Sequence, residues 1–147
     1  MPEGWRTGGG NPSCDAPWRA LRARDDTFIA GSSRGGLRGV YALLDDNAIF
    51  ARAAALSPSL WIAPEAAKKM IRESSPVRDT ILYMDYGTRE MGNRTARRTA
   101  FGEMATLLLS KGVLLDCRLV PGGEHCEASW ERQIPFFLNT LLYGIAE

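Results

Sequence analysis

The stretch Thr27-Phe28-Ile29-Ala30-Gly31-Ser32-Ser33-Arg34-Gly35-Gly36 decides the fold of this chain. Its apolar start predicts a short buried strand, and the glycines and serines that follow predict a sharp turn. Beyond the turn, apolar residues recur with the spacing of an amphipathic helix, at Leu37, Val40, Tyr41 and Leu44. Strand, sharp turn and helix, with Gly-x-Ser-x-Gly across the turn, are typical of a nucleophile elbow.

Ser33 is the candidate nucleophile of this elbow. A serine at the tip of such a turn has a strained backbone, and the residues two before and two after it come close enough to require glycine. Gly31 and Gly35 flank Ser33 in this way, whereas Ser32 lacks such glycines. The backbone N–H of Arg34, at the start of the following helix, would be one oxyanion donor. An ordinary glycine-rich turn is the alternative interpretation.

The composition predicts one globular domain and excludes several classes of partner. The chain has 147 residues, of which 45% are hydrophobic and 24% are charged, and its net charge is +1. This balance gives no electrostatic case for binding nucleic acid or an anionic membrane. The sequence shows no apolar run of membrane-spanning length and no signal-peptide pattern.

Cysteine and histidine usage argues against metal and disulfide chemistry. The cysteines, Cys14, Cys117 and Cys126, are widely spaced and fit neither a zinc pattern nor a disulfide framework. We therefore expect a reducing, cytoplasmic location. A single histidine excludes a multi-histidine metal site, and we expect no metal and no cofactor.

The remainder of the chain alternates between strand and helix patterns. Further strands are predicted at residues 50–56, 80–86 and 113–120. Helices are predicted at about 35–45, 64–73, 94–110 and 127–143, the last with a kink at Pro135. Helix-length connections between strands predict an α/β fold in which helices cover both faces of a parallel sheet.

Two of these helices have a predicted core face. In the helix at 94–110 the face consists of Phe101, Met104, Ala105, Leu108 and Leu109. In the helix at 127–143 it consists of Trp130, Ile134, Phe137, Leu138 and Leu141. Residues 1–26 lack a steady period and predict an irregular segment, with at most a helical turn near Trp18 to Leu21.

His125 is the candidate base, since a serine hydroxyl needs a base within hydrogen-bond reach. It is the only histidine, and it follows the predicted strand at 113–120. The carboxyl ends of parallel strands meet at one edge of the sheet, so we expect His125 near Ser33. A histidine in a surface loop is the alternative.

The base needs an acidic partner, and the strand at 80–86 offers two. Glu90 lies in the loop beyond the strand end and can reach toward His125, so we favour it over Asp85, which still lies within the strand. Either carboxylate could instead cap a helix or face solvent. Trp61, after the strand at 50–56, either forms a wall of the substrate pocket or packs under its loop. The Arg34 side chain either meets an anionic substrate or is only solvated.

Four stretches, residues 27–36, 55–61, 85–90 and 121–130, resemble the esterase family of α/β-hydrolases. This family includes esterase D (S-formylglutathione hydrolase), feruloyl and acetyl-xylan esterases and enterochelin esterases, the last being most similar. The resemblance implies a serine carboxylic-ester hydrolase that acts on a small-molecule ester through an acyl-enzyme. It implies that Ser33 is the nucleophile, His125 the base and Glu90 the acid.

The chain departs from the family before the elbow. Family members carry about four more strands there, because such a sheet usually fills a larger domain. Only 26 residues precede Thr27. We therefore expect an irregular segment at 1–26 and, at 27–147, the C-terminal part of an esterase domain with about four strands. The elbow strand would then be an open edge, and one oxyanion donor would be missing.

This departure leaves two alternatives to an ester hydrolase. The first is a weak or inactive fragment that forms homo-oligomers or pairs with another chain through its open edge. The second is an acyltransferase of the same family, which would use the same side chains but exclude water.

Overall fold

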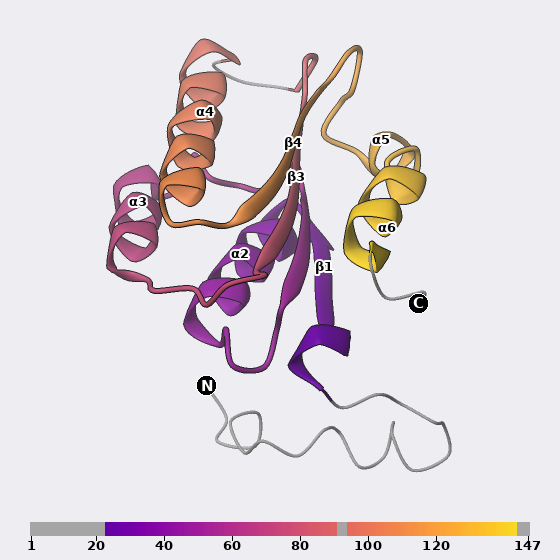
Figure 1. Cartoon of the computed structure of the whole chain (residues 1–147). Coiled ribbons are helices and arrows are strands. Elements are labelled where there is room, and N and C mark those ends of the chain that lie inside the picture. The colour runs from indigo at the N-terminus through magenta and orange to yellow at the C-terminus, as the bar shows by residue number, and fades with distance from the viewer. Residues whose placement is uncertain (1–22, 91–93, 144–147) are drawn as a thin grey trace.

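The computed structural model describes residues 23–90 and 94–143, which form one parallel sheet between two layers of helices (Figure 1). The strand order is β1-β2-β3-β4, with β1 at Phe28–Ser32, β2 at Arg52–Leu56, β3 at Ile81–Gly87 and β4 at Leu114–Val120. Helices α2 (Arg34–Asp45), α3 (Pro64–Glu73) and α4 (Arg94–Ser110) cover one face. The short α5 (Glu127–Glu131) and α6 (Ile134–Leu142) cover the other. The predicted α/β class is confirmed, and the sheet is incomplete compared with that expected for the family.

The alanines of β2 explain how a run of poor strand formers lies in the centre of the sheet. Ala53, Ala54 and Ala55 are all completely buried, with packed residues on both faces of the strand. Small side chains let the helices approach closely, and a Cβ on Gly39 of α2 would lie only 3.8 Å from the Ala54 carbonyl oxygen. Packing on both faces therefore overrides intrinsic propensity here.

The core is divided by the sheet into two clusters. The larger one lies between the sheet and α2, α3 and α4, and its fully buried members include Leu43, Ile71, Leu82, Met104 and Leu108. The smaller one lies under α5 and α6. It consists of Ala54, Leu56, Tyr83 and Leu141, against which Phe28, Trp130 and Phe137 pack.

The segment 127–143 differs from its prediction, because it forms two helices rather than one kinked helix. α5 ends at Glu131 and α6 begins at Ile134, with Pro135 in the first turn of α6. Proline lacks an N–H, and its ring excludes the carbonyl four residues earlier, which belongs to Glu131. A first-turn position avoids both problems.

Several side chains predicted for the core are exposed. Because α6 starts anew at Ile134, the predicted face does not continue along it, and Ile134 and Leu138 are 41% and 40% exposed. In α4, Leu109 is 57% exposed while the other predicted members of its face are buried. It lies in the last turn, beside the solvent-facing side of the helix.

Other element boundaries shift by a few residues. α2 begins at Arg34, β2 begins at Arg52 rather than residue 50, and β3 extends through Gly87. The helices predicted at 64–73 and 94–110 are confirmed. The turn predicted near Trp18 to Leu21 lies outside the described residues.

Part of the segment predicted to be irregular is attached to the sheet. Arg24–Asp26 form a short 3-10 turn. The Arg24 guanidinium donates to the Asn47 carbonyl oxygen at 2.6 Å and to Thr80 Oγ1 at 2.9 Å. These bonds fix the chain at the amino end of β1, where the path into the elbow begins.

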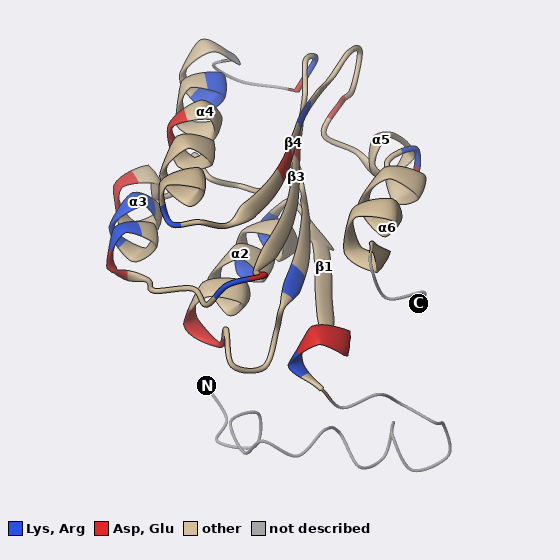
Figure 2. Cartoon of the chain, viewed as in Figure 1, with Lys and Arg blue, Asp and Glu red and all other residues tan. Residues whose placement is uncertain are grey.

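β1 lies at one edge of the sheet. On one face of the sheet, Phe28 of β1 packs in the cluster under α6. α6 contains no charged residue, as its uniformly tan ribbon in Figure 2 shows. None of the helices in the described part of the chain has the length and apolar character that a membrane crossing requires.

Candidate active site

Ser33 lies at the tip of the turn between β1 and α2, and its backbone has φ 54° and ψ −118°. This left-handed region is uncommon for residues other than glycine. The turn is held by the Ser33 N–H, which donates to the Leu56 carbonyl oxygen at 2.9 Å. The Ser33 carbonyl oxygen accepts from the Leu37 N–H at 3.1 Å. The strained backbone presents the hydroxyl at the carboxyl end of the sheet.

The prediction that glycine is required two residues before and two residues after Ser33 is confirmed at Gly31 and wrong at Gly35. A Cβ on Gly31 would lie 2.6 Å from the Gly35 carbonyl carbon, a separation that real side chains do not adopt. A Cβ on Gly35 would meet nothing within 4 Å. The close approach is between position 31 and the backbone at 35, so only the first glycine is needed for space.

The structure brings the three predicted side chains into one hydrogen-bonded row. His125 Nε2 lies 2.8 Å from Ser33 Oγ, and His125 Nδ1 lies 3.0 Å from Glu90 Oε2. An ionised carboxylate can only accept, so Nδ1 carries the proton and Nε2 of the neutral ring accepts from the Ser33 hydroxyl. This is the arrangement in which a histidine can remove the serine proton.

Glu90 is fully buried, and its second oxygen is also engaged. Glu90 Oε1 accepts from the Gly87 N–H at 2.8 Å. The loop that carries Glu90 is tied to the loop before His125, because the Arg89 N–H donates to the Gly123 carbonyl oxygen at 2.8 Å. Gly122 N–H donates to Thr88 Oγ1 at 2.8 Å. The carboxylate is therefore held in place before any substrate binds.

Asp85, the alternative acid, makes its hydrogen bonds elsewhere. It accepts from the Ser57 N–H at 2.8 Å and from the Tyr83 hydroxyl at 3.0 Å. Burial raises the pKa of Asp85 to about 6, although these two hydrogen bonds oppose the rise. Asp85 thus organises the loop after β2 and is not the carboxylate in contact with His125.

Two tryptophans hold the His125 ring edge-to-face. The Trp61 ring centroid lies 5.4 Å from that of His125, and the Trp130 centroid lies 5.1 Å from it. Trp130 Nε1 donates to Ser57 Oγ at 3.0 Å, which fixes the indole. Trp130 was predicted only as a core residue, since helical periodicity does not reveal that it meets a histidine. Trp61 lies against the His125 ring, and its role as a wall of the substrate pocket stays a prediction.

Ser59 is a site residue that the sequence reasoning missed. Its side chain is 2% exposed, and its Oγ lies 3.2 Å from Ser33 Oγ. Its N–H donates to the Ser33 carbonyl oxygen at 3.0 Å. The sequence feature that could have indicated Ser59 is its position in the loop directly after β2, beside the elbow.

Arg34 is the first residue of α2, where backbone N–H groups have no partner within the helix. The Arg34 side chain is exposed.

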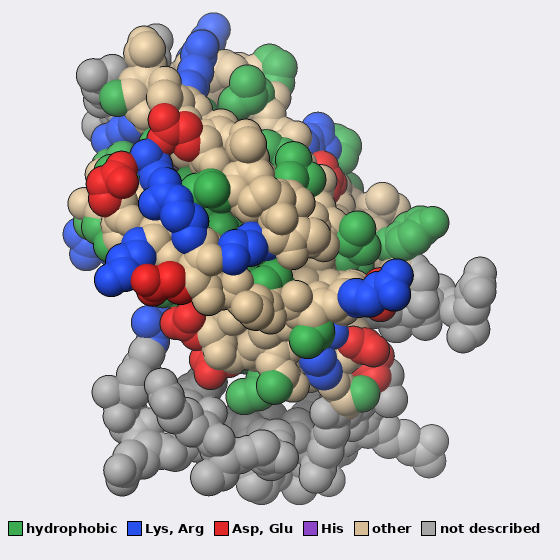
Figure 3. All heavy atoms as spheres, turned by 60° about the vertical axis from the view of Figure 1, so that its left-hand side comes forward, with side chains coloured by type: hydrophobic (Ala, Val, Ile, Leu, Met, Phe, Trp, Pro, Cys, Tyr) green, Lys and Arg blue, Asp and Glu red, His purple; other side chains and the backbone are tan. Residues whose placement is uncertain are grey.

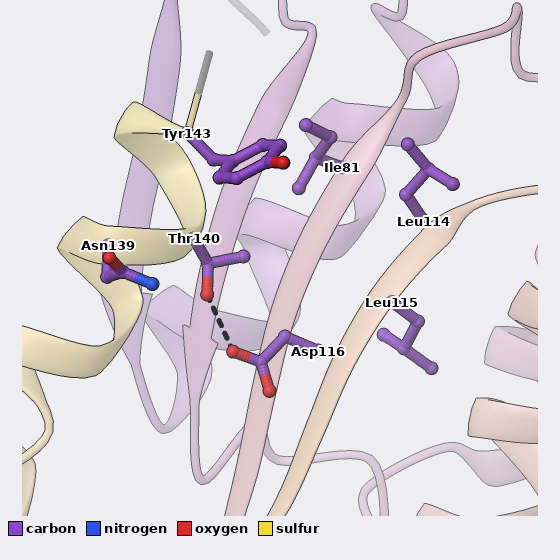
Figure 4. Close-up of a pocket in the computed structure, with 7 residues that line it drawn as sticks. All are labelled: Ile81, Leu114, Leu115, Asp116, Asn139, Thr140 and Tyr143. Carbon is purple, nitrogen blue, oxygen red and sulfur yellow. Dashed lines mark hydrogen bonds between the residues drawn. The ribbon is translucent and has the colours of Figure 1, made fainter. Parts of the chain in front are cut away.

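A shallow cavity of about 400 Å³ lies away from these residues (Figure 4). It is formed by the amino ends of β3 and β4 and by α6, with Thr140 donating to Asp116 at 2.6 Å. Its lining residues are Ile81, Leu114, Leu115, Asp116, Asn139, Thr140 and Tyr143. Within residues 23–90 and 94–143, no cluster of three or more histidine, cysteine or acidic side chains is placed to hold a metal ion.

The fold and the elbow define an α/β-hydrolase architecture. A family model described as "Putative esterase" matches residues 15–140, which is most of the chain. The chain belongs to this esterase family. No curated protein matches it in sequence.

Solved esterase structures share the fold. The enterochelin esterase of Shigella flexneri superposes with a TM-score of 0.71 at 22% identity, covering 92% of this chain and 35% of that one. For a ferulic acid esterase the TM-score is 0.67 at 16% identity, with coverages of 89% and 55%. For FphF, a fluorophosphonate-binding serine hydrolase of Staphylococcus aureus, it is 0.60 at 18% identity, with coverages of 88% and 59%. The chain thus spans from 35% to 59% of the length of these proteins.

Proposed function

We propose that this chain carries the reacting side chains of a serine carboxylic-ester hydrolase that works through an acyl-enzyme. The observation that carries the proposal is the row Ser33–His125–Glu90, with distances of 2.8 and 3.0 Å. Family membership supports the same reaction class. The substrate is a small-molecule ester.

In the first half of the reaction, Ser33 Oγ attacks the ester carbonyl carbon as His125 Nε2 takes the hydroxyl proton. Glu90 accepts the Nδ1 hydrogen bond and balances the charge of the protonated ring. The backbone N–H of Arg34 and the amino end of α2 stabilise the oxyanion. His125 then returns the proton to the departing alcohol, which leaves the acyl group on Ser33.

In the second half, a water molecule takes the place of the alcohol. His125 Nε2 removes a proton from the water as it attacks the acyl carbon. The same proton then returns to Ser33 Oγ when the acid departs. In each half of the reaction His125 first accepts a proton and then donates it, and Ser33 carries the acyl group between the two halves. Ser33 and His125 are therefore both indispensable.

A fluorophosphonate probe tests the proposal directly. It should form a covalent adduct on Ser33, found by mass spectrometry of the labelled peptide. Ser33→Ala should abolish labelling, and Ser32→Ala, which changes the neighbouring hydroxyl, should retain it. A folded protein that takes no label, or that is labelled equally in the Ser33→Ala variant, would overturn the proposal.

A second candidate function is association through the open edge of the sheet. On β1, Phe28 packs in the cluster under α6, so Ala30, two residues later, lies on the same face, and Ala30 is exposed. One flank of α6 is anchored over β4, because Phe136 stacks under the Arg118 guanidinium and Thr140 bonds Asp116.

The opposite flank of α6 therefore faces the β1 side of the sheet. It carries Ile134, Leu138 and Leu142, which are 41%, 40% and 49% exposed. The occupant that we propose for this edge is a polypeptide that supplies further strands of an esterase domain. The structural neighbours support this choice, because they extend well beyond the part that the chain matches.

Mixing tests this association. The chain should form a one-to-one complex with the separately produced N-terminal part of a family esterase, as measured by light scattering. Leu138→Lys should weaken the complex, and Lys69→Glu, on the far face in α3, should not. A stable monomer with cooperative thermal unfolding and no complex would rule the association out.

A further inference from the structure

Arg97 is a cation beside the candidate site that has no carboxylate partner among the described residues. It lies near the start of α4, and its guanidinium carbon is 4.0 Å from the Trp61 ring centroid. The neighbouring Lys68 of α3, in contrast, pairs with both Glu65 and Glu103. Figure 3 shows acidic and basic side chains intermixed over this helical face.

Trp61 connects this cation to the reacting side chains. The same indole lies edge-to-face against the His125 ring, with 5.4 Å between the ring centroids. Since the Arg97 guanidinium carbon lies 4.0 Å from the Trp61 centroid, Trp61 is the one side chain between Arg97 and His125 in this chain of contacts. Stacking on an aromatic face holds a guanidinium in place and leaves its N–H groups free to bind an anion. Figure 2 shows basic residues near the amino end of α4, at the sheet edge where the strands end.

The other charges around the site do not neutralise Arg97. Glu90 is fully buried and is bonded to His125 and Gly87. Glu124 and Glu127, on the segment that carries His125, are exposed and form no ion pair with any arginine in the described part of the chain. The fixed charge next to Trp61 is therefore positive.

We propose that the site prefers esters that carry a carboxylate, which binds the Arg97 guanidinium beside Trp61. The proposal rests on the function proposed above and adds a substrate class to it. A carboxylate can accept two parallel hydrogen bonds from a guanidinium, an arrangement that a neutral amide or ester cannot reproduce. Since Arg97 is only half-buried, solvent screens its charge. We therefore expect the carboxylate to raise the affinity of a substrate by only about two- to five-fold.

Binding of benzoate and benzamide tests the proposal without requiring turnover. These ligands have the same ring and differ in charge, and the ring protons of His125, the only histidine, provide an unambiguous NMR signal. Benzoate should bind about two- to five-fold more tightly than benzamide. Arg97→Gln should abolish this advantage, and Arg97→Lys should retain part of it. The control Arg78→Gln, in the exposed loop before β3, should leave it intact.

Turnover of a matched ester pair gives a second readout. The ratio of kcat/KM for 4-acetoxybenzoate to that for methyl 4-acetoxybenzoate should fall in Arg97→Gln and stay unchanged in Arg78→Gln. The ratio should also fall as salt is added, because salt screens partly exposed charges.

The outcomes separate the two proposals. Fluorophosphonate labelling of Ser33 combined with equal binding of benzoate and benzamide, or with an advantage that survives Arg97→Gln, would overturn the carboxylate site alone. A benzoate advantage that depends on Arg97, in a protein that no fluorophosphonate labels, would support the anion site and overturn the esterase proposal.

Discussion

Gly87, the last residue of β3, and Gly123, in the loop before His125, touch backbone to backbone. A Cβ on Gly87 would lie 2.4 Å from the Gly123 carbonyl oxygen. That same oxygen accepts from the Arg89 N–H, and the Gly87 N–H donates to Glu90. The contact between Glu90 and His125 thus depends on a close approach of two residues that carry no side chain.

Gly87→Ala should therefore disrupt the site. The added methyl group forces the two loops apart, and we expect kcat/KM to fall by about 100-fold and stability by roughly 2 kcal/mol. Ester hydrolysis and urea unfolding measure the two effects. Gly102→Ala in α4 is the control, because its Cβ meets nothing within 4 Å. It should stabilise the protein by about 0.5–1 kcal/mol and leave activity unchanged. An active Gly87→Ala variant would contradict this account.

Two amide substitutions distinguish the acid of the site. In Glu90→Gln the side chain presents an NH₂ group to His125 or turns away, so the correct tautomer is no longer favoured and kcat should fall by about 10²–10⁴-fold. In Asp85→Asn the acceptor for the Ser57 N–H is retained, and kcat should change by less than about 10-fold. Fluorophosphonate labelling rates for the two variants provide the comparison. A larger loss in Asp85→Asn would reverse the assignment.

The buried Asp85 should make stability depend on pH. Burial raises its pKa from an ordinary 3.8 to about 6, so the folded state binds this proton more tightly than the unfolded state does. The contribution to stability is then fully present below about pH 4 and is lost as pH rises through about 6. The loss is on the order of 2–3 kcal/mol, since each pKa unit corresponds to about 1.4 kcal/mol.

Urea unfolding of the wild type and Asp85→Asn measures this dependence. The free energy of unfolding of the variant relative to the wild type should increase by on the order of 2 kcal/mol between about pH 4.5 and pH 7.5. The variant keeps the acceptor and lacks the titration, so it isolates the charge. A difference that does not change with pH would show that Asp85 ionises normally.

Ser59→Ala should slow the reaction of Ser33 without unfolding the protein. The Ser59 hydroxyl lies 3.2 Å from Ser33 Oγ, while its backbone N–H separately supports the Ser33 carbonyl. Removing the hydroxyl leaves the backbone bond intact, so we expect kcat to fall by roughly 3- to 30-fold, of the size of one misplaced hydrogen bond. The thermal midpoint should change little. Unchanged kinetics would show that the hydroxyl does not orient the nucleophile.

Much of the fold could be predicted because local patterns encode it. The periodicity of 94–110 and the first-turn proline at Pro64 gave two helices with the correct bounds. The single helix predicted for 127–143 was wrong, since Pro135 could either kink a helix or begin one. Local pattern could not decide between these outcomes, because the choice depends on how the segment packs against the sheet.

The sequence alone determined that Ser33 lies at an elbow and that His125 lies beyond a strand, because glycine spacing and hydrophobic periodicity are local properties. Parallel strand order then required both residues to lie at one edge of the sheet. Only the tertiary structure decided which carboxylate meets His125, and it placed Glu90 there and Asp85 against Ser57.

The positions of Trp130 and Arg97 were likewise decided only by the fold. Arg97 reaches Trp61, and Trp130 is held against His125 by its bond to Ser57, so both positions depend on segments that are far apart in the chain. The close approach of Gly87 and Gly123, which brings Glu90 to His125, is of the same kind, and no repeat or spacing in the sequence records such contacts.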